Sequence, residues 1–247
     1  VRTLIGTGAA NDVILGAARK HAADMIVMAT HARTGIAHAL LGSIAEKVIR
    51  GAACPVLTVR RKPRRRARRE ETAMKIARIL VPVDFSRHSL KALAWAIDFA
   101  EPFGAAIDLV HVVEPIAYAT PADLYAGMAT QLGNLLAEQR RSARQQLDEL
   151  AAKYAKRGVS LRIHLRDGIA YREIVDAAKQ LNADLVVQAT HGRTGLSHVL
   201  LGSVAERVVR TSECPVLTIR TTAAGAKKRT AAADKKKVAA DKAPPPG

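Results

Sequence analysis

The chain has 247 residues, of which 49% are hydrophobic and only 3% aromatic, and its formal net charge is +17. That hydrophobic fraction suits a globular protein, but the length excludes two complete domains of about 150 residues each. No apolar run approaches the ~20 residues that a membrane-spanning helix needs, and no signal peptide is visible. We therefore expect a cytoplasmic protein without membrane contact.

The positive charge is concentrated in two segments. Residues 60–69 carry eight basic side chains and no acidic one, and residues 221–247 carry a net charge of +5. The rest of the chain therefore has a net charge of only about +4. We interpret residues 61–73 as a basic linker and 221–247 as a disordered basic tail. Such segments are solvated connectors or make weak, salt-sensitive contacts with nucleic acid, and the tail has no aromatic side chain to stack on bases.

Residues 1–60 and 161–220 are two copies of one segment. They align without a gap at an offset of 160 positions, and about half of the aligned residues are identical. The complete copy extends over residues 74–220, so residues 1–60 are predicted to be the carboxyl-terminal part of a truncated first copy. A fragment of this kind would expose an open sheet edge.

Within residues 74–220 the hydrophobic pattern alternates between strands and helices. Short apolar runs predict the strands, and apolar residues at helical spacing predict the helices. In chain order we expect a strand at 77–84, a helix from Ser86 to Gly104, a strand at 106–113, a helix at 122–156, a strand at 159–165, a helix at 169–181, a strand at 184–190, a helix at 203–211 and a strand at 215–219. This alternation predicts an α/β fold with a doubly wound parallel sheet, which binds ligands where the strand order reverses.

The segment after the fourth predicted strand carries the pattern that points to chemistry. Gly192 is followed by nine residues and then by Gly202 and Ser203, where a helix is predicted to begin. Glycine lets the backbone approach a ligand closely, and a helix N-terminus presents free N–H groups to phosphate. These three residues therefore could form a phosphate cradle.

A purely structural interpretation of the same serine stays open. Ser203 precedes Glu206 by three residues, and Ser43 precedes Glu46 by three residues in the first copy. This is the spacing of a capping box, which satisfies the first N–H groups of a helix without any ligand.

The segments that carry these residues resemble one known family. Residues 81–86 read V-P-V-D-F-S, and the chain continues after the fourth strand as A-T-H-G-R-T-G-L, L-L-G-S-V-A-E-R-V-V-R and C-P-V-L-T-I-R. They resemble universal stress protein domains, whose nucleotide-binding motif is G-x2-G-x9-G-[S/T]. The resemblance covers residues 74–220 fully and 1–60 in part, and it implies a flavodoxin-like, doubly wound sheet of five parallel strands, with dimer contact through the last strand.

The resemblance also implies a ligand and a site. In ATP-binding members of the family the motif loop wraps the phosphates, and the acidic residue after the first strand holds the ribose. We therefore expect ATP, with or without Mg²⁺, as the ligand. The nucleotide-binding residues at matching positions are Pro82, Asp84, Ala189, Gly192, Gly202, Ser203 and Val204.

Both copies depart from the family motif. Ala189 stands where the motif has its first glycine, which weakens the predicted site without closing it. In the first copy Ala29 and Ala32 replace both leading glycines, and no residue corresponds to Asp84. We expect the first copy to bind no nucleotide.

Two pairs of histidines recur beside the motif, and a catalytic role competes with simple hydrogen bonding in the loop. No carboxylate in the adjacent loop is placed to orient either imidazole, so loop hydrogen bonding is the favoured interpretation. The pairs are His31 with His191 and His38 with His198.

Three other residues of chemical interest have structural interpretations. His111 lies within an apolar strand and is predicted to be a buried, hydrogen-bonded core residue. Cys54 and Cys214 occupy the same position of each copy without any metal or redox motif, so we interpret them as small buried hydrophobic residues.

Three functional hypotheses follow. The first is an ATP-binding stress regulator, non-enzymatic or nearly so, in which nucleotide orders residues 193–201. The second is weak ATP hydrolysis at the same site, for which no metal-holding carboxylate and water-orienting residue are identified. The third is a nucleotide-free interaction protein that dimerises through residues 215–219 while its tail contacts nucleic acid, or in which residues 55–59 pair with 215–219 of the same chain.

Overall fold

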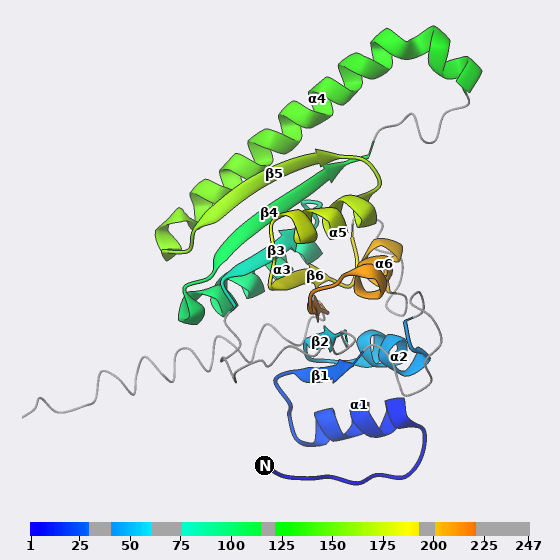
Figure 1. The fold of residues 1–247 in the computed structure, drawn as a ribbon, viewed down its shortest axis with the longest axis vertical. Coiled ribbons are helices and arrows are strands. Elements are labelled where there is room, and N and C mark those ends of the chain that lie inside the picture. The colour runs from blue at the N-terminus through cyan, green and yellow to red at the C-terminus, as the bar shows by residue number, and fades with distance from the viewer. Residues whose placement is uncertain (30–40, 61–75, 115–121, 193–200, 221–247) are drawn as a thin grey trace, which may run out of the picture.

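The computed structural model describes residues 1–29, 41–60, 76–114, 122–192 and 201–220 (Figure 1). Their strands are β1 (Ile26–Ala29), β2 (Val56–Val59), β3 (Arg78–Pro82), β4 (Ala106–Val113), β5 (Leu161–Asp167), β6 (Leu185–Ala189) and β7 (Val216–Ile219). Their helices are α1 (Ala10–Lys20), α2 (Ser43–Gly51), α3 (Arg87–Ala100), α4 (Ala122–Tyr154), α5 (Ala170–Gln180) and α6 (Ser203–Thr211), with short 3₁₀ turns at Glu101–Phe103 and Ala155–Arg157.

The seven described strands form a single sheet in the order β1-β2-β7-β6-β3-β4-β5. The five strands of the complete copy, β3 to β7, are all parallel to their neighbours. The predicted α/β class and the doubly wound, five-stranded parallel sheet are therefore confirmed. In chain order these strands lie 5-4-1-2-3, so the order reverses between β3 and β6.

One predicted strand is shifted along the chain. We expected a strand at 159–165, whereas β5 begins two residues later and extends to Asp167. Its ends are set by pairing with β4, which runs from Ile107 opposite Leu161 to Val113 opposite Asp167. Long-range pairing thus decided a boundary that local hydrophobicity placed too early.

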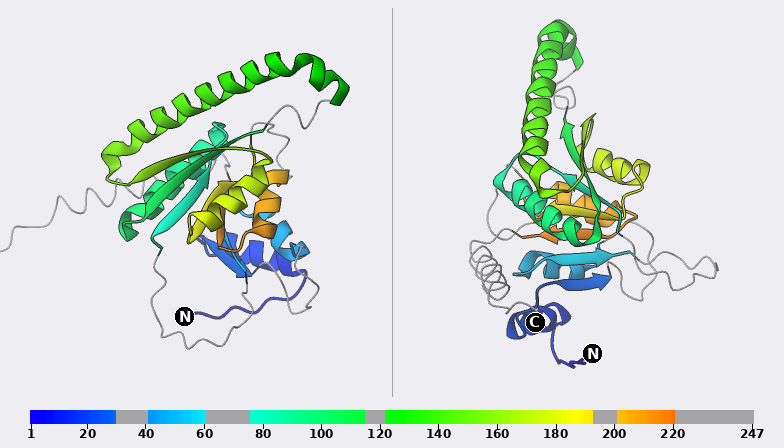
Figure 2. Two further views of the ribbon diagram at one scale, coloured as in Figure 1. Left: turned by 45° about the horizontal axis from the view of Figure 1, so that its top comes forward. Right: turned by 90° about the vertical axis from the view of Figure 1, so that its left-hand side faces the viewer.

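Two apolar cores cover the two faces of the sheet. Ile79 and Val81 of β3 pack with α3 and α4 on one face, while Leu80 packs with α2, α5 and α6 on the other (Figure 2). All three side chains are fully buried, as alternation in a strand covered on both sides requires. Each contributes about 1.5–3 kcal/mol relative to an exposed side chain.

Residues 1–60 extend the same sheet beyond β7. β1 is parallel to β2, with Ile26 opposite Val56, and β2 is antiparallel to β7, with Leu57 opposite Leu217. β7 is therefore paired on both of its edges within one chain, so the strand to which the family resemblance assigned the dimer contact already has a partner on each side. Figure 2 shows β1 and β2, in blue, at one end of the sheet.

Candidate functional site

A cleft of about 850 Å³ opens beyond the carboxyl ends of β3, β4 and β6, at the point where the strand order reverses. Doubly wound sheets place their ligand sites at this position because the helices on either side of it leave on opposite faces. The seven residues predicted from the sequence all line this one cleft. They are Pro82, Asp84, Ala189, Gly192, Gly202, Ser203 and Val204.

The β3 side of the cleft presents a carboxylate on a rigid turn. The backbone N–H of Ser86 donates to Asp84 Oδ1 at 3.0 Å, and the Asp84 N–H donates to Ser89 Oγ at 3.3 Å. Ser86 in turn caps α3, as predicted, by accepting from the Ser89 N–H at 3.2 Å. These bonds hold the acidic side chain at the start of a helix.

A strained residue and a buried histidine support that turn. Phe85 has a φ of +63°, a conformation that costs a non-glycine residue free energy and persists only when its surroundings impose it. Its ring packs 4.5 Å from that of His111, whose Nδ1–H donates to the Val83 carbonyl at 2.7 Å. His111 is only 7% exposed, so the prediction of a hydrogen-bonded core histidine is confirmed.

The β6 side of the cleft carries two glycines, and one of them lies against the carboxylate. The Gly202 N–H donates to the Thr190 carbonyl at 2.8 Å, which folds the chain back toward the strand end. A Cβ atom at Gly192 would lie 2.6 Å from Asp84 Oδ2, closer than real side chains approach. Only glycine therefore lets this backbone lie against Asp84 without a shift of the carboxylate.

The capping box that the sequence left open is not formed. Gly202 occupies the N-cap position, Ser203 is the first helical residue, and no side chain caps α6. Glu206 lies 3.9 Å from Arg210 instead of reaching back to the helix start. The interpretation fails because a capping serine must occupy the N-cap itself, one residue earlier than Ser203.

The fragment shows the same departure from a capping box. Gly42 is the N-cap of α2, Ser43 is its first residue, and Glu46 pairs with Arg50 at 2.6 Å. In both copies the first turn of the helix therefore keeps N–H groups without side-chain partners. In the complete copy these groups face the cleft.

His191 lines the cleft and has a second histidine nearby. His191 Nδ1 lies 2.9 Å from Thr190 Oγ1, whereas its buried Nε2 has no hydrogen-bond partner among the described residues. The ring of His88 lies 6.1 Å away. Burial lowers the pKa of His88 below its ordinary value, and the charge of Arg87 lowers it further. Sequence reasoning missed His88, because it lies on α3 far from the glycine motif.

A polar stripe on α4 forms another wall that sequence reasoning missed. Glu138, Ser142 and Gln146 recur every four residues and line the cleft from one face of that helix. This spacing was a visible signal, since residues four apart share a helix face. Glu114 also lines the cleft, where its Oε1 accepts from the Ala170 N–H at 2.9 Å and so caps α5.

Several expectations lie outside the described residues. They concern the loop at 193–200, the linker at 61–73, the tail at 221–247, and the residues Ala32, His31, His38 and His198. Cys54 and Cys214 are both free thiols. Across the described ranges, no three histidine, cysteine or acidic side chains gather as metal ligands, and no helix has the length and apolar character needed to cross a bilayer.

Comparisons with known proteins identify the family. The model of the Universal stress protein family matches residues 1–60 and 75–220. Universal stress protein MJ0531 of Methanocaldococcus jannaschii is 35% identical over 144 residues, which are 58% of this chain and 81% of that protein. Universal stress protein Rv2005c of Mycobacterium tuberculosis is 30% identical over 202 residues, which are 80% of this chain but 62% of the relative.

Solved structures agree with the sequence comparisons. UspA from Lactobacillus plantarum shares 30% identity at a TM-score of 0.53, over 59% of this chain and 99% of that one. Protein PA1789 of Pseudomonas aeruginosa, at 21% identity and a TM-score of 0.63, shows the same fold over 96% of this chain and 74% of its own. On the strength of the duplicated motif, the sheet order and these matches, the chain belongs to the universal stress protein family.

Proposed function

We propose that the cleft binds an adenine nucleotide, ATP alone or with Mg²⁺, and that binding regulates a cytoplasmic stress protein rather than supplying an enzyme with substrate. One observation carries the proposal. Asp84, Gly192 and the uncapped N-terminus of α6 converge on one cleft at the switch point of the sheet. A nucleotide needs a hydrogen-bond acceptor for its sugar hydroxyls, here the Asp84 carboxylate, and hydrogen-bond donors for its phosphates, here the N–H groups that begin α6.

The two sides of the cleft have opposite electrostatic character. A carboxylate accepts hydrogen bonds from sugar hydroxyls but repels phosphate, which supports assigning the ribose to Asp84 in this proposal. The free N–H groups at Ser203 and Val204, with the positive end of the α6 dipole, attract phosphate. The Ser203 hydroxyl supports this assignment, because it is exposed and is not used to cap its own helix.

Hydrolysis is at most a minor activity in this proposal. Phosphoryl transfer uses carboxylates to hold a metal ion and a further residue to orient water. Asp84 is assigned to ribose, Glu114 already accepts from the backbone of α5, and Glu138 pairs with Arg141 at 2.6 Å. A regulatory role needs only that the nucleotide binds and alters the surface around the cleft.

Calorimetric titration of the full chain with ATP, with and without Mg²⁺, tests the proposal. The double substitution Gly202→Val with Ser203→Ala is expected to weaken binding by at least about tenfold. A Cβ at residue 202 would lie 3.2 Å from the Thr190 carbonyl oxygen, so the backbone of this turn must shift by a few tenths of an ångström, and the larger valine side chain adds bulk beside the helix N–H groups. Circular dichroism checks that the variant is folded.

The duplication supplies a matched control. Gly42→Val with Ser43→Ala makes the same change at the start of α2, where no counterpart of Asp84 exists. We expect this control to bind ATP as the unmodified chain does. Equal affinity of both double variants, or no measurable binding by the unmodified chain, would overturn the proposal and leave a nucleotide-free interaction protein.

A further inference from the structure

The residues assigned to the ligand so far contact only the parts that all nucleotides share. Asp84 is assigned to the ribose, and the N–H groups of Ser203 and Val204 are assigned to the phosphates. Ribose and phosphates are the same in ATP and GTP, so these contacts do not distinguish one base from another. A group that selects the base must lie elsewhere in the cleft.

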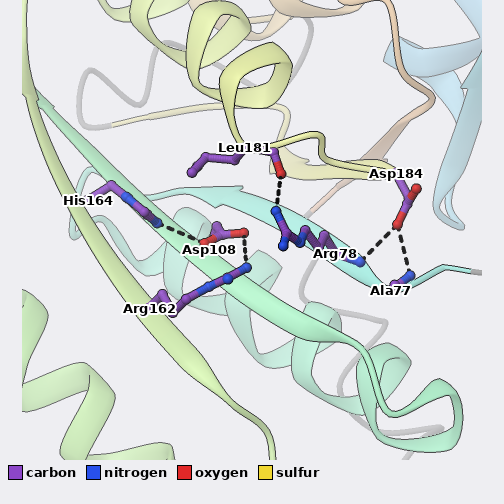
Figure 3. A network of polar contacts seen from close by, with 7 residues as sticks. All are labelled: Ala77, Arg78, Asp108, Arg162, His164, Leu181 and Asp184. Carbon is purple, nitrogen blue, oxygen red and sulfur yellow. Dashed lines mark hydrogen bonds and ion pairs between the residues drawn. The ribbon is translucent and has the colours of Figure 1, made fainter.

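A polar network on the α5 side of the sheet has its charges paired within the protein (Figure 3). Asp108 is fully buried in β4, and its two carboxylate oxygens accept from Arg162 and His164, both at 2.8 Å. Asp184 Oδ2 accepts from the Arg78 N–H at 2.9 Å, where β3 begins. The network thus lies toward the amino ends of the strands, whereas the cleft is at their carboxyl ends, and its role is structural.

The polar stripe on α4 differs, because it lines the cleft and keeps hydrogen-bonding groups without a partner. Gln146 Nε2 donates to the Ser142 carbonyl at 3.4 Å and to Ser142 Oγ at 3.3 Å. These two bonds hold the amide nitrogen against the helix and turn Oε1 away from it, since the two atoms lie on opposite sides of the amide group. Among the described residues, none donates to Gln146 Oε1 and none accepts from the Ser142 hydroxyl.

The order of the strands places this stripe at the base end of the proposed nucleotide. The phosphate donors follow β6, the ribose acceptor Asp84 follows β3, and the next strand in the sheet is β4, on which α4 packs. A nucleotide that extends from α6 past Asp84 therefore directs its base toward β4 and α4. There Val113 and Ala143, which are 5% and 4% exposed, line the cleft beside Gln146 and offer apolar contact to the faces of a base.

The free groups of the stripe match adenine and not guanine. Adenine carries an amino group, which donates, next to a ring nitrogen, which accepts, so Gln146 Oε1 and the Ser142 hydroxyl complement the two. Guanine has a carbonyl oxygen in place of the amino group, and this oxygen would face Oε1 as a second acceptor. To donate to it, Gln146 would have to turn its amide and lose both bonds to Ser142.

We propose that Gln146 and Ser142 select adenine over guanine in this cleft. Gln146 Oε1 accepts from the exocyclic amino group, and the Ser142 hydroxyl donates to the adjacent ring nitrogen. Ser142 is also a positioning residue, because it holds the Gln146 amide in the orientation that presents Oε1. The inference rests on the proposed nucleotide site and adds the base preference that the glycine–serine motif does not supply.

Calorimetric titration of the full chain with ATP, GTP and purine riboside triphosphate tests the proposal, since the last ligand lacks only the amino group of ATP. We expect the unmodified chain to bind ATP about tenfold more tightly than either of the others. Gln146→Leu removes the acceptor and should bind ATP and purine riboside triphosphate equally. A merely structural role of Gln146 would instead weaken both ligands by the same factor and leave their ratio at about ten.

Ser142→Ala tests the positioning role. It removes one of the two bonds that hold the Gln146 amide, so the amide can turn toward guanine, and the preference for ATP over GTP should fall from about tenfold to about threefold. Gln145→Leu is the matched control, because Gln145 is the adjacent residue on α4, is exposed and donates to Glu149 Oε1 at 3.0 Å outside the cleft. All three ligands should bind this control as they bind the unmodified chain.

The possible outcomes separate this inference from the proposed function. An unmodified chain that binds ATP and GTP equally would overturn the base assignment and leave the nucleotide site standing. So would a tenfold preference for ATP over purine riboside triphosphate that persists in Gln146→Leu. Absence of binding by all three ligands would overturn the proposed function and the base assignment together.

Discussion

The fragment and the complete copy share half of their sequence over 60 aligned positions, yet they differ in what they bury. α1, β1, α2 and β2 recur as α5, β6, α6 and β7 with nearly the same ends. Val187 is fully buried between its neighbours, whereas Val27 at the same position is 63% exposed. Local sequence therefore reproduces the elements, but burial needs β3 and α3, which only one copy has.

The same comparison separates the two halves of the candidate site. Gly42 and Gly202 begin their helices with closely similar backbone angles, and neither helix has a side-chain cap. Only Gly202 lies across a cleft from Asp84. A helix N-terminus by itself is half of a nucleotide site, and the acidic half comes from an element outside the duplicated segment.

The largest difference in stability is expected when each of two valines at matching positions of the copies is truncated to alanine. Val187→Ala should lower the free energy of unfolding by about 2–3 kcal/mol, because it removes buried methyl groups and leaves a cavity. Val27→Ala should cost less than about 0.5 kcal/mol, because its side chain is already in water. Urea unfolding of both variants measures the difference. Equal losses would show that the face of β1 is covered in solution.

A smaller difference in stability is expected from replacing two matched threonines at the junction between β2 and β7, where the two copies meet. The Thr58 hydroxyl donates to the Val216 carbonyl at 3.0 Å across the β2–β7 junction. The buried Thr218 hydroxyl, its counterpart, has no partner among the described residues. Thr58→Val should therefore cost about 1 kcal/mol, while Thr218→Val should be neutral or stabilising. Thermal unfolding of the two isosteric variants distinguishes them, and a larger loss at Thr218 would contradict this account of the junction.

The smallest effect concerns pH and belongs to the complete copy alone. Burial and Arg87 lower the pKa of His88 below 6.5, so the unfolded chain takes up this proton first as the pH falls. His88 therefore favours the folded state above about pH 6.5 and loses that contribution as the pH falls through its folded-state pKa. The thermal unfolding midpoint of the His88→Gln variant should therefore fall less between pH 7 and pH 5 than the midpoint of the unmodified chain.

Sequence patterns predicted best where short-range physics controls the outcome. The strand at 106–113 and the helix at 203–211 have the predicted ends, because apolar periodicity and the glycine before the helix define them locally. The seven candidate nucleotide-binding residues came instead from the family resemblance, and all seven line one cleft. The capping box was wrong because a spacing of three does not reveal which residue occupies the N-cap.

The sequence by itself determined the duplication, the alternation of strands and helices, and the glycine–serine motif, since each is a pattern of neighbouring residues. Only the tertiary structure decided that β2 runs antiparallel to β7, that Gly192 lies against Asp84, and that His88 reaches His191. Gly192 and Asp84 are more than a hundred positions apart in the chain. Their approach depends on how the whole sheet orders its strands, which no local pattern of residues encodes.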